Sequence, residues 1–76
     1  RIYDLHLKNV TAADKSGKTV ELGRGQINIP VLVCALREVR YTGVCSLEFE
    51  KDENDPLPGV AESVGYFRGV LDATRA

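Results

Sequence analysis

The sequence has no tryptophan, no methionine, only two cysteines and almost no net charge. Cys34 and Cys45 are too few for a disulfide framework, and their spacing fits neither a CxxC redox pair nor a zinc knuckle, so we expect both to be small buried hydrophobic residues. Ten basic and eleven acidic residues offer no basic patch to nucleic acid and no polybasic cluster to a membrane surface. No apolar run approaches the roughly 18 residues of a membrane span. We therefore expect neither nucleic acid nor a membrane as partner.

The composition is that of an ordinary folded domain. Of the 76 residues, 43% are hydrophobic and 28% are charged, which excludes a disordered tail and a low-complexity linker. A chain this short buries only about 60% of its unfolded surface, so its core is small. It is also far shorter than a (β/α)₈ barrel, which takes about 250 residues. We treat residues 1–76 as one unit.

Two segments, residues 2–10 and 44–50, alternate apolar and polar side chains with the period of two that is typical of strands. Their apolar sides consist of Tyr3, Leu5, Leu7, Cys45, Leu47 and Phe49. Their polar sides consist of Asp4, His6, Lys8, Ser46, Glu48 and Glu50. Each predicted strand therefore has one face for a core and one polar face.

Two further segments, residues 28–40 and 56–73, have apolar residues at helical spacing. Asn28 and Asp55 are the residues that we expect to cap them, and Pro30 suits the first turn of the first helix. The order strand, helix, strand, helix predicts an α/β fold with two parallel strands and a right-handed crossover.

Residues 11–26 are polar and contain three glycines, which predicts a long loop. Within it, AADKSGKT (residues 12–19) matches a relaxed Walker A motif. A phosphate-binding loop must lead directly into a helix, but Gly23 and Gly25 lie where that helix would be. We therefore interpret Gly17 as a turn residue and reject a nucleotide site.

Four polar residues lie at the C-terminal ends of the predicted strands: His6, Lys8, Glu48 and Glu50. Because parallel strands end at the same edge of a sheet, we expect these side chains to meet there. An imidazole and a carboxylate are suitable ligands for a divalent cation, and an ammonium group can hold an anionic oxygen. The alternative is a sheet with one solvent-exposed face, whose polar residues only keep the protein soluble.

Four segments together resemble a known family: LHLKNV (5–10), LGRGQINIP (22–30), YTGVCSLEFEKD (41–52) and ESVGYFRGVL (62–71). They are similar to the C-terminal portion of the xylose-isomerase-like TIM barrels, the sugar phosphate isomerases and epimerases related to endonuclease IV. The resemblance keeps the order and spacing over nearly the whole chain. It implies a βαβα quarter of a TIM barrel, completed by a missing N-terminal part or by self-association into a homo-oligomer through open strand edges.

The resemblance also implies roles for individual residues. His6 and Glu48 would ligate a divalent metal (Mn, Mg, Zn or Co). Glu48 would also move a proton beside the carbonyl of a sugar or sugar phosphate, while the metal stabilises the enediolate. Lys8 would contact the substrate, and Glu50 and Arg24 are further candidates for substrate binding.

The sequence departs from the family pattern at Asn9 and Asn28, where the family often has Asp. Asn28 can still cap its helix, whereas Asn9 removes a charge near the expected metal and weakens support for a ligand. The family's other ligands, a Glu and an Asp, come from strands that this sequence does not contain, so we expect the isolated chain to be inactive.

Two other functions compete with this one. The first is a non-catalytic oligomerising βαβα module whose polar face is solvated or lines the interior of an assembly. The second is DNA repair chemistry like that of endonuclease IV, which the absence of a basic patch opposes. The sequence selects neither the sugar nor the metal, and it does not indicate a cellular compartment.

Overall fold

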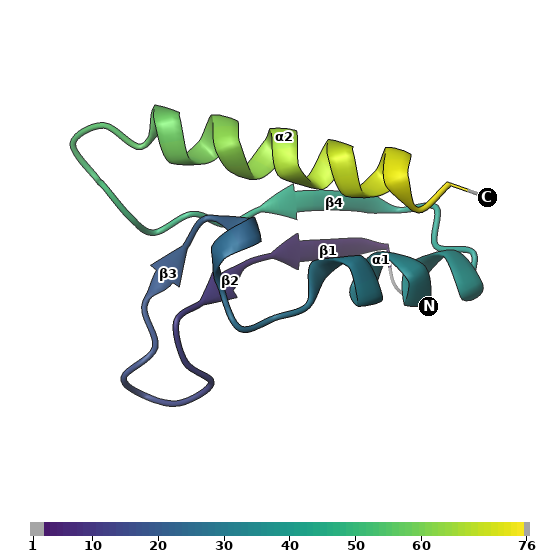
Figure 1. Ribbon diagram of the computed structural model, residues 1–76, viewed down its shortest axis with the longest axis horizontal. Coiled ribbons are helices and arrows are strands. Elements are labelled where there is room, and N and C mark those ends of the chain that lie inside the picture. Colours follow the sequence, from purple (N-terminus) through teal and green to yellow (C-terminus); the bar gives the residue numbers. More distant parts are fainter. Residues whose placement is uncertain (1–2, 76) are drawn as a thin grey trace.

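The structure of the chain, a computed structural model, describes residues 3–75. Its elements in chain order are β1 (Asp4–Leu7), β2 (Asn9–Val10), β3 (Thr19–Val20), the short 3₁₀ helix η1 (Leu22–Arg24), α1 (Ile29–Glu38), β4 (Val44–Leu47) and α2 (Leu57–Ala73) (Figure 1). No helix among these residues is long and apolar enough to span a membrane.

The main sheet has two strands, β1 and β4, which are parallel. Leu5 pairs with Cys45 and Leu7 with Leu47. The backbone N–H of Glu48 extends the ladder by donating to the carbonyl of Leu7 at 2.8 Å. In Figure 1 both arrows point to the same end of the molecule, and each helix runs back in the opposite direction. The predicted α/β fold with two helices and a parallel pair of strands is thus confirmed.

The two helices cover the apolar side of this sheet. The buried core consists of Leu7, Leu22, Ile29, Val33 and Val70. Ile29 and Val33 are only 1% exposed, and burying an aliphatic side chain of this size stabilises the fold by about 1.5–3 kcal/mol. Leu7 and Leu47 pack against the helices. Because side chains alternate along a strand, the neighbouring residues on each strand point to the other face of the sheet.

The start of α1 follows the sequence pattern. The side-chain oxygen of Asn28 accepts a hydrogen bond from the N–H of Val31 at 3.1 Å, and Pro30 lies in the first turn. The end of α1 was predicted at Arg40 but comes two residues earlier, at Glu38, because Arg40 adopts a left-handed conformation with φ 56° that a helix cannot contain.

The second helix begins differently from the prediction. Asp55 does not cap α2; the residue before its first turn is Pro56, which makes no capping hydrogen bond with a side chain. Pro58 occupies the first turn, where its missing N–H costs nothing. Leu57, the first residue of α2, is 70% exposed.

The predicted first strand is broken at Lys8. Asn9 and Val10 leave the main sheet and pair antiparallel with Thr19 and Val20, so the region predicted as a loop contains a hairpin. Gly17 makes a turn at its tip, where its N–H donates to the carbonyl of Asp14 at 3.0 Å. The turn role of Gly17 is confirmed, and a strand follows it instead of the helix that a phosphate-binding loop requires.

The prediction of two buried cysteines is wrong for Cys34 and holds only in part for Cys45. Cys34 is exposed, because the core side of α1 is formed by Ile29 and Val33 and position 34 faces away from it. Cys45 is half-buried beside the core, and burial raises the pKa of its thiol. Both are free thiols.

Candidate functional site

The structure brings four of the predicted site residues together as two pairs. Nδ1 of His6 lies 3.1 Å from Oε1 of Glu48, and Nζ of Lys8 donates to Oε1 of Glu50 at 2.7 Å. Each pair joins residues 42 positions apart in the chain. The contacts exist because β1 and β4 are adjacent and run the same way, so that their polar residues leave the sheet side by side at the C-terminal ends.

His6 lies between two carboxylates. Its second ring nitrogen, Nε2, is 3.2 Å from Oδ2 of Asp4, which precedes it by two residues on the same strand face. The three side chains are half-exposed, from 48% for Glu48 to 56% for His6. The hydrogen bond with Glu48, and then the one with Asp4, raises the pKa of His6 above 6.5, because both carboxylates favour the protonated ring.

The second pair has simpler electrostatics. The hydrogen bond to Glu50 raises the pKa of Lys8, and the same bond lowers the pKa of Glu50. Both groups are therefore charged over the whole physiological pH range. An ammonium group at this position can hold an anionic oxygen of a ligand once Glu50, which is 72% exposed, turns away from it.

The separation of the first pair fits two ligands of one cation. Nitrogen and oxygen ligands that lie about 2.1 Å from a divalent cation are about 3.0–3.4 Å apart from each other, and Nδ1 of His6 and Oε1 of Glu48 are 3.1 Å apart. Within residues 3–75, however, no group of three or more His, Cys, Asp or Glu side chains could hold a metal ion. The described residues therefore offer at most two ligands, His6 and Glu48, to one cation at this position.

Arg24, a predicted substrate contact, is engaged elsewhere. Its Nε and Nη2 donate to the two carboxylate oxygens of Glu62 at 2.7 and 2.6 Å. This bidentate pair joins η1 to α2 and raises the pKa of the Arg24 guanidinium. The structure does not bring Arg24 to His6 and Glu48.

Asn9 has a structural role that the sequence pattern did not reveal. Its side chain is only 1% exposed. Its Nδ2 donates to the carbonyls of Leu22 and Ile27 at 2.8 and 3.0 Å, and its Oδ1 accepts from the N–H groups of Val10 and Ile27 at 2.9 Å each. All four partners are backbone groups. Asn9 therefore holds the loop after β1 in place, instead of acting beside the metal ligands as expected.

A second link joins the loops that follow the two parallel strands. Glu21, 8% exposed, accepts a hydrogen bond from Nζ of Lys51 at 3.1 Å. Its own backbone N–H and this bond from Lys51 lower the pKa of the Glu21 carboxyl. Lys51 also donates to Asp52 at 3.1 Å. The sequence pattern did not reveal this link, because Glu21 lies in the segment predicted as a loop and Lys51 lies after the second predicted strand. The link ties the two loops together at the end of the sheet that carries His6 and Glu48.

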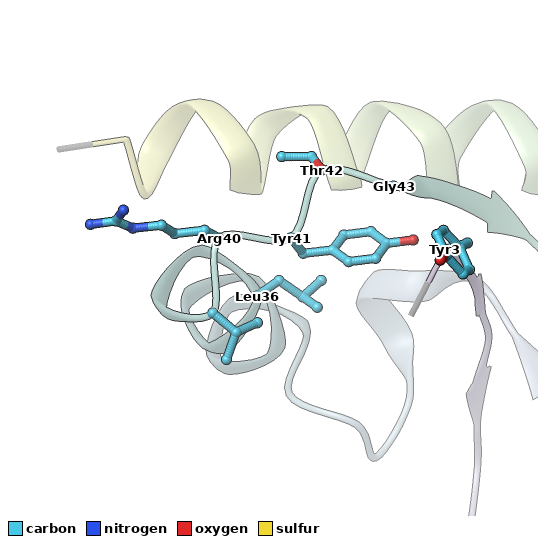
Figure 2. Close-up of a pocket in the computed structure, with 7 residues that line it drawn as sticks. Tyr3, Leu36, Arg40, Tyr41, Thr42 and Gly43 are labelled. Atoms are coloured by element: carbon cyan, nitrogen blue, oxygen red, sulfur yellow. The ribbon is translucent and has the colours of Figure 1, made fainter. Parts of the chain in front are cut away.

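A pocket of about 690 Å³ lies at the opposite end of the strands. It is lined by Tyr3, Leu36, Val39, Arg40, Tyr41, Thr42 and Gly43. Figure 2 shows the ring of Tyr41 pointing toward Tyr3, while the guanidinium of Arg40 points away from both. The Tyr41 hydroxyl is used by the chain itself, donating to the carbonyl of Val44 at 2.7 Å. Among residues 3–75, no His, Asp, Glu or Cys lines this pocket.

Comparison with models of known protein families and with curated proteins gave no match. What can be argued about function therefore comes from the residues of the chain and their geometry. Groups able to bind a ligand or transfer a proton gather at one polar edge, which is formed by His6, Glu48, Lys8 and Glu50.

Proposed function

We propose that the chain is the C-terminal βαβα quarter of a metal-dependent sugar or sugar phosphate isomerase or epimerase of the xylose-isomerase-like barrel type. One observation carries the proposal: an imidazole and a carboxylate meet at 3.1 Å on the C-terminal ends of adjacent parallel strands. Barrel enzymes place their catalytic groups at this end of the sheet. A pair of barrel strands also needs one apolar side that packs under the helices and one polar side that faces away from them. The strands β1 and β4 have both.

The proposed reaction is proton transfer at the carbon next to a carbonyl. His6 and Glu48 hold a divalent cation, whose chemical contribution when bound is to polarise the substrate carbonyl. Glu48 directs one carboxylate oxygen at His6, which leaves its second oxygen to accept and return the proton. Lys8 binds an anionic oxygen of the sugar or its phosphate, with Glu50 as the group that it exchanges for the substrate.

The proposal assigns a lesser part to Arg24. Because Nε and Nη2 of Arg24 bind Glu62, a substrate contact through these two nitrogens would require this bidentate pair to open. The isolated chain is expected to be inactive, because two ligands do not enclose a catalytic cation. The remaining ligands and pocket walls belong to further strands of the barrel.

Metal uptake tests the first half of the proposal. In equilibrium dialysis with Mn²⁺ or Zn²⁺, the wild-type chain is expected to bind the ion, and His6→Ala and Glu48→Gln are expected to reduce binding. Glu53→Gln, which removes an exposed carboxylate after β4, is the matched control and should bind as wild type does. Uptake that is unaffected by His6→Ala contradicts the proposal.

Proton exchange tests the second half. In a polypeptide that contains the remaining barrel strands, the substrate proton next to the carbonyl should exchange with deuterium from solvent. Glu48→Gln should slow this exchange by about 10²–10⁴-fold, the usual contribution of a general acid–base group. An unchanged exchange rate would show that Glu48 is not the proton-transfer group.

A second candidate function has a specific observation in its favour. The main sheet has only two strands among the described residues, so β1 and β4 each leave one edge unpaired. Tyr3 and Val44, at the start of these strands, are 73% and 63% exposed. Unpaired edges beside exposed apolar side chains favour a non-catalytic module that pairs strands with further copies of itself. Sedimentation velocity distinguishes the two: concentration-dependent oligomers without metal uptake support the module.

A further inference from the structure

We infer that further copies of this chain complete the polar edge: the unpaired edge of β4 in one copy pairs in parallel with the unpaired edge of β1 in the next, and four copies close into an eight-stranded barrel. Each copy then supplies charged residues to the polar edge of its neighbour. The inference rests on the barrel arrangement of the proposed function, and on neither its metal nor its reaction.

The backbone of both strands is ready for a further strand. Among residues 3–75, the main sheet ends after β1 on one side and after β4 on the other. The N–H groups of Val44 and Glu48 bind carbonyls on the β1 side. Backbone groups alternate in direction along a strand, so Cys45 and Leu47 direct theirs to the unpaired side. Such an edge is a template for another chain, and pairing β4 with β1 uses both edges of every copy.

The two edges carry complementary charges at their C-terminal ends. β1 ends with His6 and Lys8, whereas β4 is followed by Glu48 and Glu50. Within one copy, Nζ of Lys8 already donates to Oε1 of Glu50 at 2.7 Å. The Glu50 side chain is still 72% exposed, so its carboxylate has room for a second ammonium group. The β1 strand of the next copy brings its own Lys8 to that side, and basic and acidic groups then alternate around the barrel.

The apolar residues of the strands are incompletely buried in a single copy. Leu5, Cys45 and Leu47 are only half-buried, although strands of a parallel sheet are normally covered on both faces. Val44 lies on the polar side of β4 by alternation and is 63% exposed. Branched side chains such as valine fill the interior of an eight-stranded barrel. Closure of the barrel would therefore bury Val44 and the edge of the apolar layer together.

The number of copies follows from the sheet. Each copy contributes two parallel strands, β1 and β4, and a helix follows each of them along the chain. Eight strands make a barrel whose interior is just wide enough for side chains to fill, and four copies supply them. An interface between two different edges closes into a ring when the rotation fits, and otherwise extends into a filament. The mass of the assembly distinguishes these two cases.

Analytical ultracentrifugation of charge variants tests the inference. The wild type is expected to sediment with the mass of four 8.3 kDa chains. Glu50→Lys and Lys8→Glu should each shift the protein to the mass of one chain, because like charges then face each other at every edge. Combining both substitutions restores the alternation and should restore the four-chain mass. Glu53→Lys makes the same change of charge at an exposed residue after β4 and should match wild type.

The outcomes separate this inference from the proposed function. A wild type that stays a single chain, stops at dimers or grows without limit with concentration overturns the inference, as does a four-chain assembly that Glu50→Lys leaves intact. None of these results bears on the proposed reaction, whose remaining strands another polypeptide could supply. A four-chain assembly that takes up no Mn²⁺ supports the inference and contradicts the proposed metal site.

A second measurement covers the case in which the single variants unfold, which circular dichroism would show. Hydrogen exchange of the wild type should reveal backbone N–H groups of Cys45 and Leu47 that are protected at high protein concentration and lose this protection on dilution. Free exchange of both N–H groups at every concentration overturns the inference, because the edge of β4 would then be open to solvent.

Discussion

The side-chain amide of Asn9 occupies the space directly beside the α-carbon of Gly25. A methyl group at Gly25 would overlap Oδ1 of Asn9 and come within 2.8 Å of the carbonyl oxygen of Val10. Next to this contact, the N–H of Gln26 donates to the same Val10 carbonyl at 2.9 Å. Because Gly25 has no side chain, the loop before α1 can lie against the start of the β2–β3 hairpin. The position of the Asn9 side chain therefore requires glycine at position 25.

Gly25→Ala is expected to destabilise the chain by about 1–3 kcal/mol, the usual range for overpacking a filled site. The cost arises because Asn9 cannot move aside without losing its hydrogen bonds to buried backbone groups. Urea denaturation followed by circular dichroism measures the change. A stability equal to wild type would mean that the loop accommodates the methyl group and that the contact is not tight.

The matched control for this substitution is Gly65→Ala. Gly65 lies in the middle of α2, and a methyl group there would meet nothing within 4 Å. Since alanine is a better helix former than glycine by about 1 kcal/mol, this variant should be more stable than wild type. Opposite signs for the two substitutions would separate the crowding at Gly25 from any general effect of adding a methyl group.

Asn9→Asp is a nearly isosteric substitution, but we expect it to lower the free energy of unfolding strongly. The carboxylate cannot donate, so the carbonyls of Leu22 and Ile27 lose their partner and face a buried negative charge. We expect a loss of at least about 2 kcal/mol at neutral pH. Part of it should return in acid, where the protonated carboxyl regains one donor. Urea midpoints measured across the acid range test this, and a variant as stable as wild type would contradict the role assigned to Asn9.

The parallel pair of strands could be predicted because its signal is periodic. Alternating residues on either side of a helical segment indicate two strands of the same direction. The contact between His6 and Glu48 follows from that direction and from the position of both residues near the C-terminal ends of their strands. The cap of α1 at Asn28 was predictable for a similar reason: it depends on neighbours within one turn.

The parts that escaped prediction depend on single contacts between distant residues. Asn9 binds backbone groups 13 and 18 residues further along, and Arg24 binds a carboxylate 38 residues away. No periodicity accompanies such contacts, so the hairpin was missed and Arg24 was assigned to a substrate. Asp4 was predicted on the polar face, but its contact with Nε2 of His6 depends on the orientation of the imidazole ring, which the sequence pattern does not specify.

Glu21 should affect stability on the acid side. Because its folded pKa is lowered below the ordinary 4.5 by its backbone N–H and by Lys51, it stabilises the fold fully above that pH. This contribution is lost as the pH falls through the lowered folded value. Glu21→Gln is therefore expected to flatten the acid limb of the stability profile, measured as the urea midpoint against pH. Glu53→Gln, at an exposed site, should leave the limb unchanged, and equal slopes for both variants would refute the assignment.

His6 should have the opposite dependence on pH. Hydrogen bonds to Glu48 and Asp4 raise its folded pKa above 6.5, so its stabilising contribution is complete below that value and is lost as the pH rises through the folded pKa. The single imidazole can be titrated directly by ¹H–¹⁵N NMR in metal-free buffer. Glu48→Gln should lower the pKa of His6 more than Asp4→Asn does, because the bond to Glu48 contributes most.

The dependence of stability on pH gives a check of His6 that does not depend on spectra. The urea midpoint of wild type should fall between about pH 5.5 and about pH 8.5 by more than that of His6→Gln, whose amide does not titrate. A wild-type pKa at or below 6.5, or a larger effect of Asp4→Asn than of Glu48→Gln, would contradict the geometry of the ring between its two carboxylates. Because protons and metal ions compete for Nδ1, a confirmed high pKa would also mean that metal uptake by this chain strengthens as the pH rises.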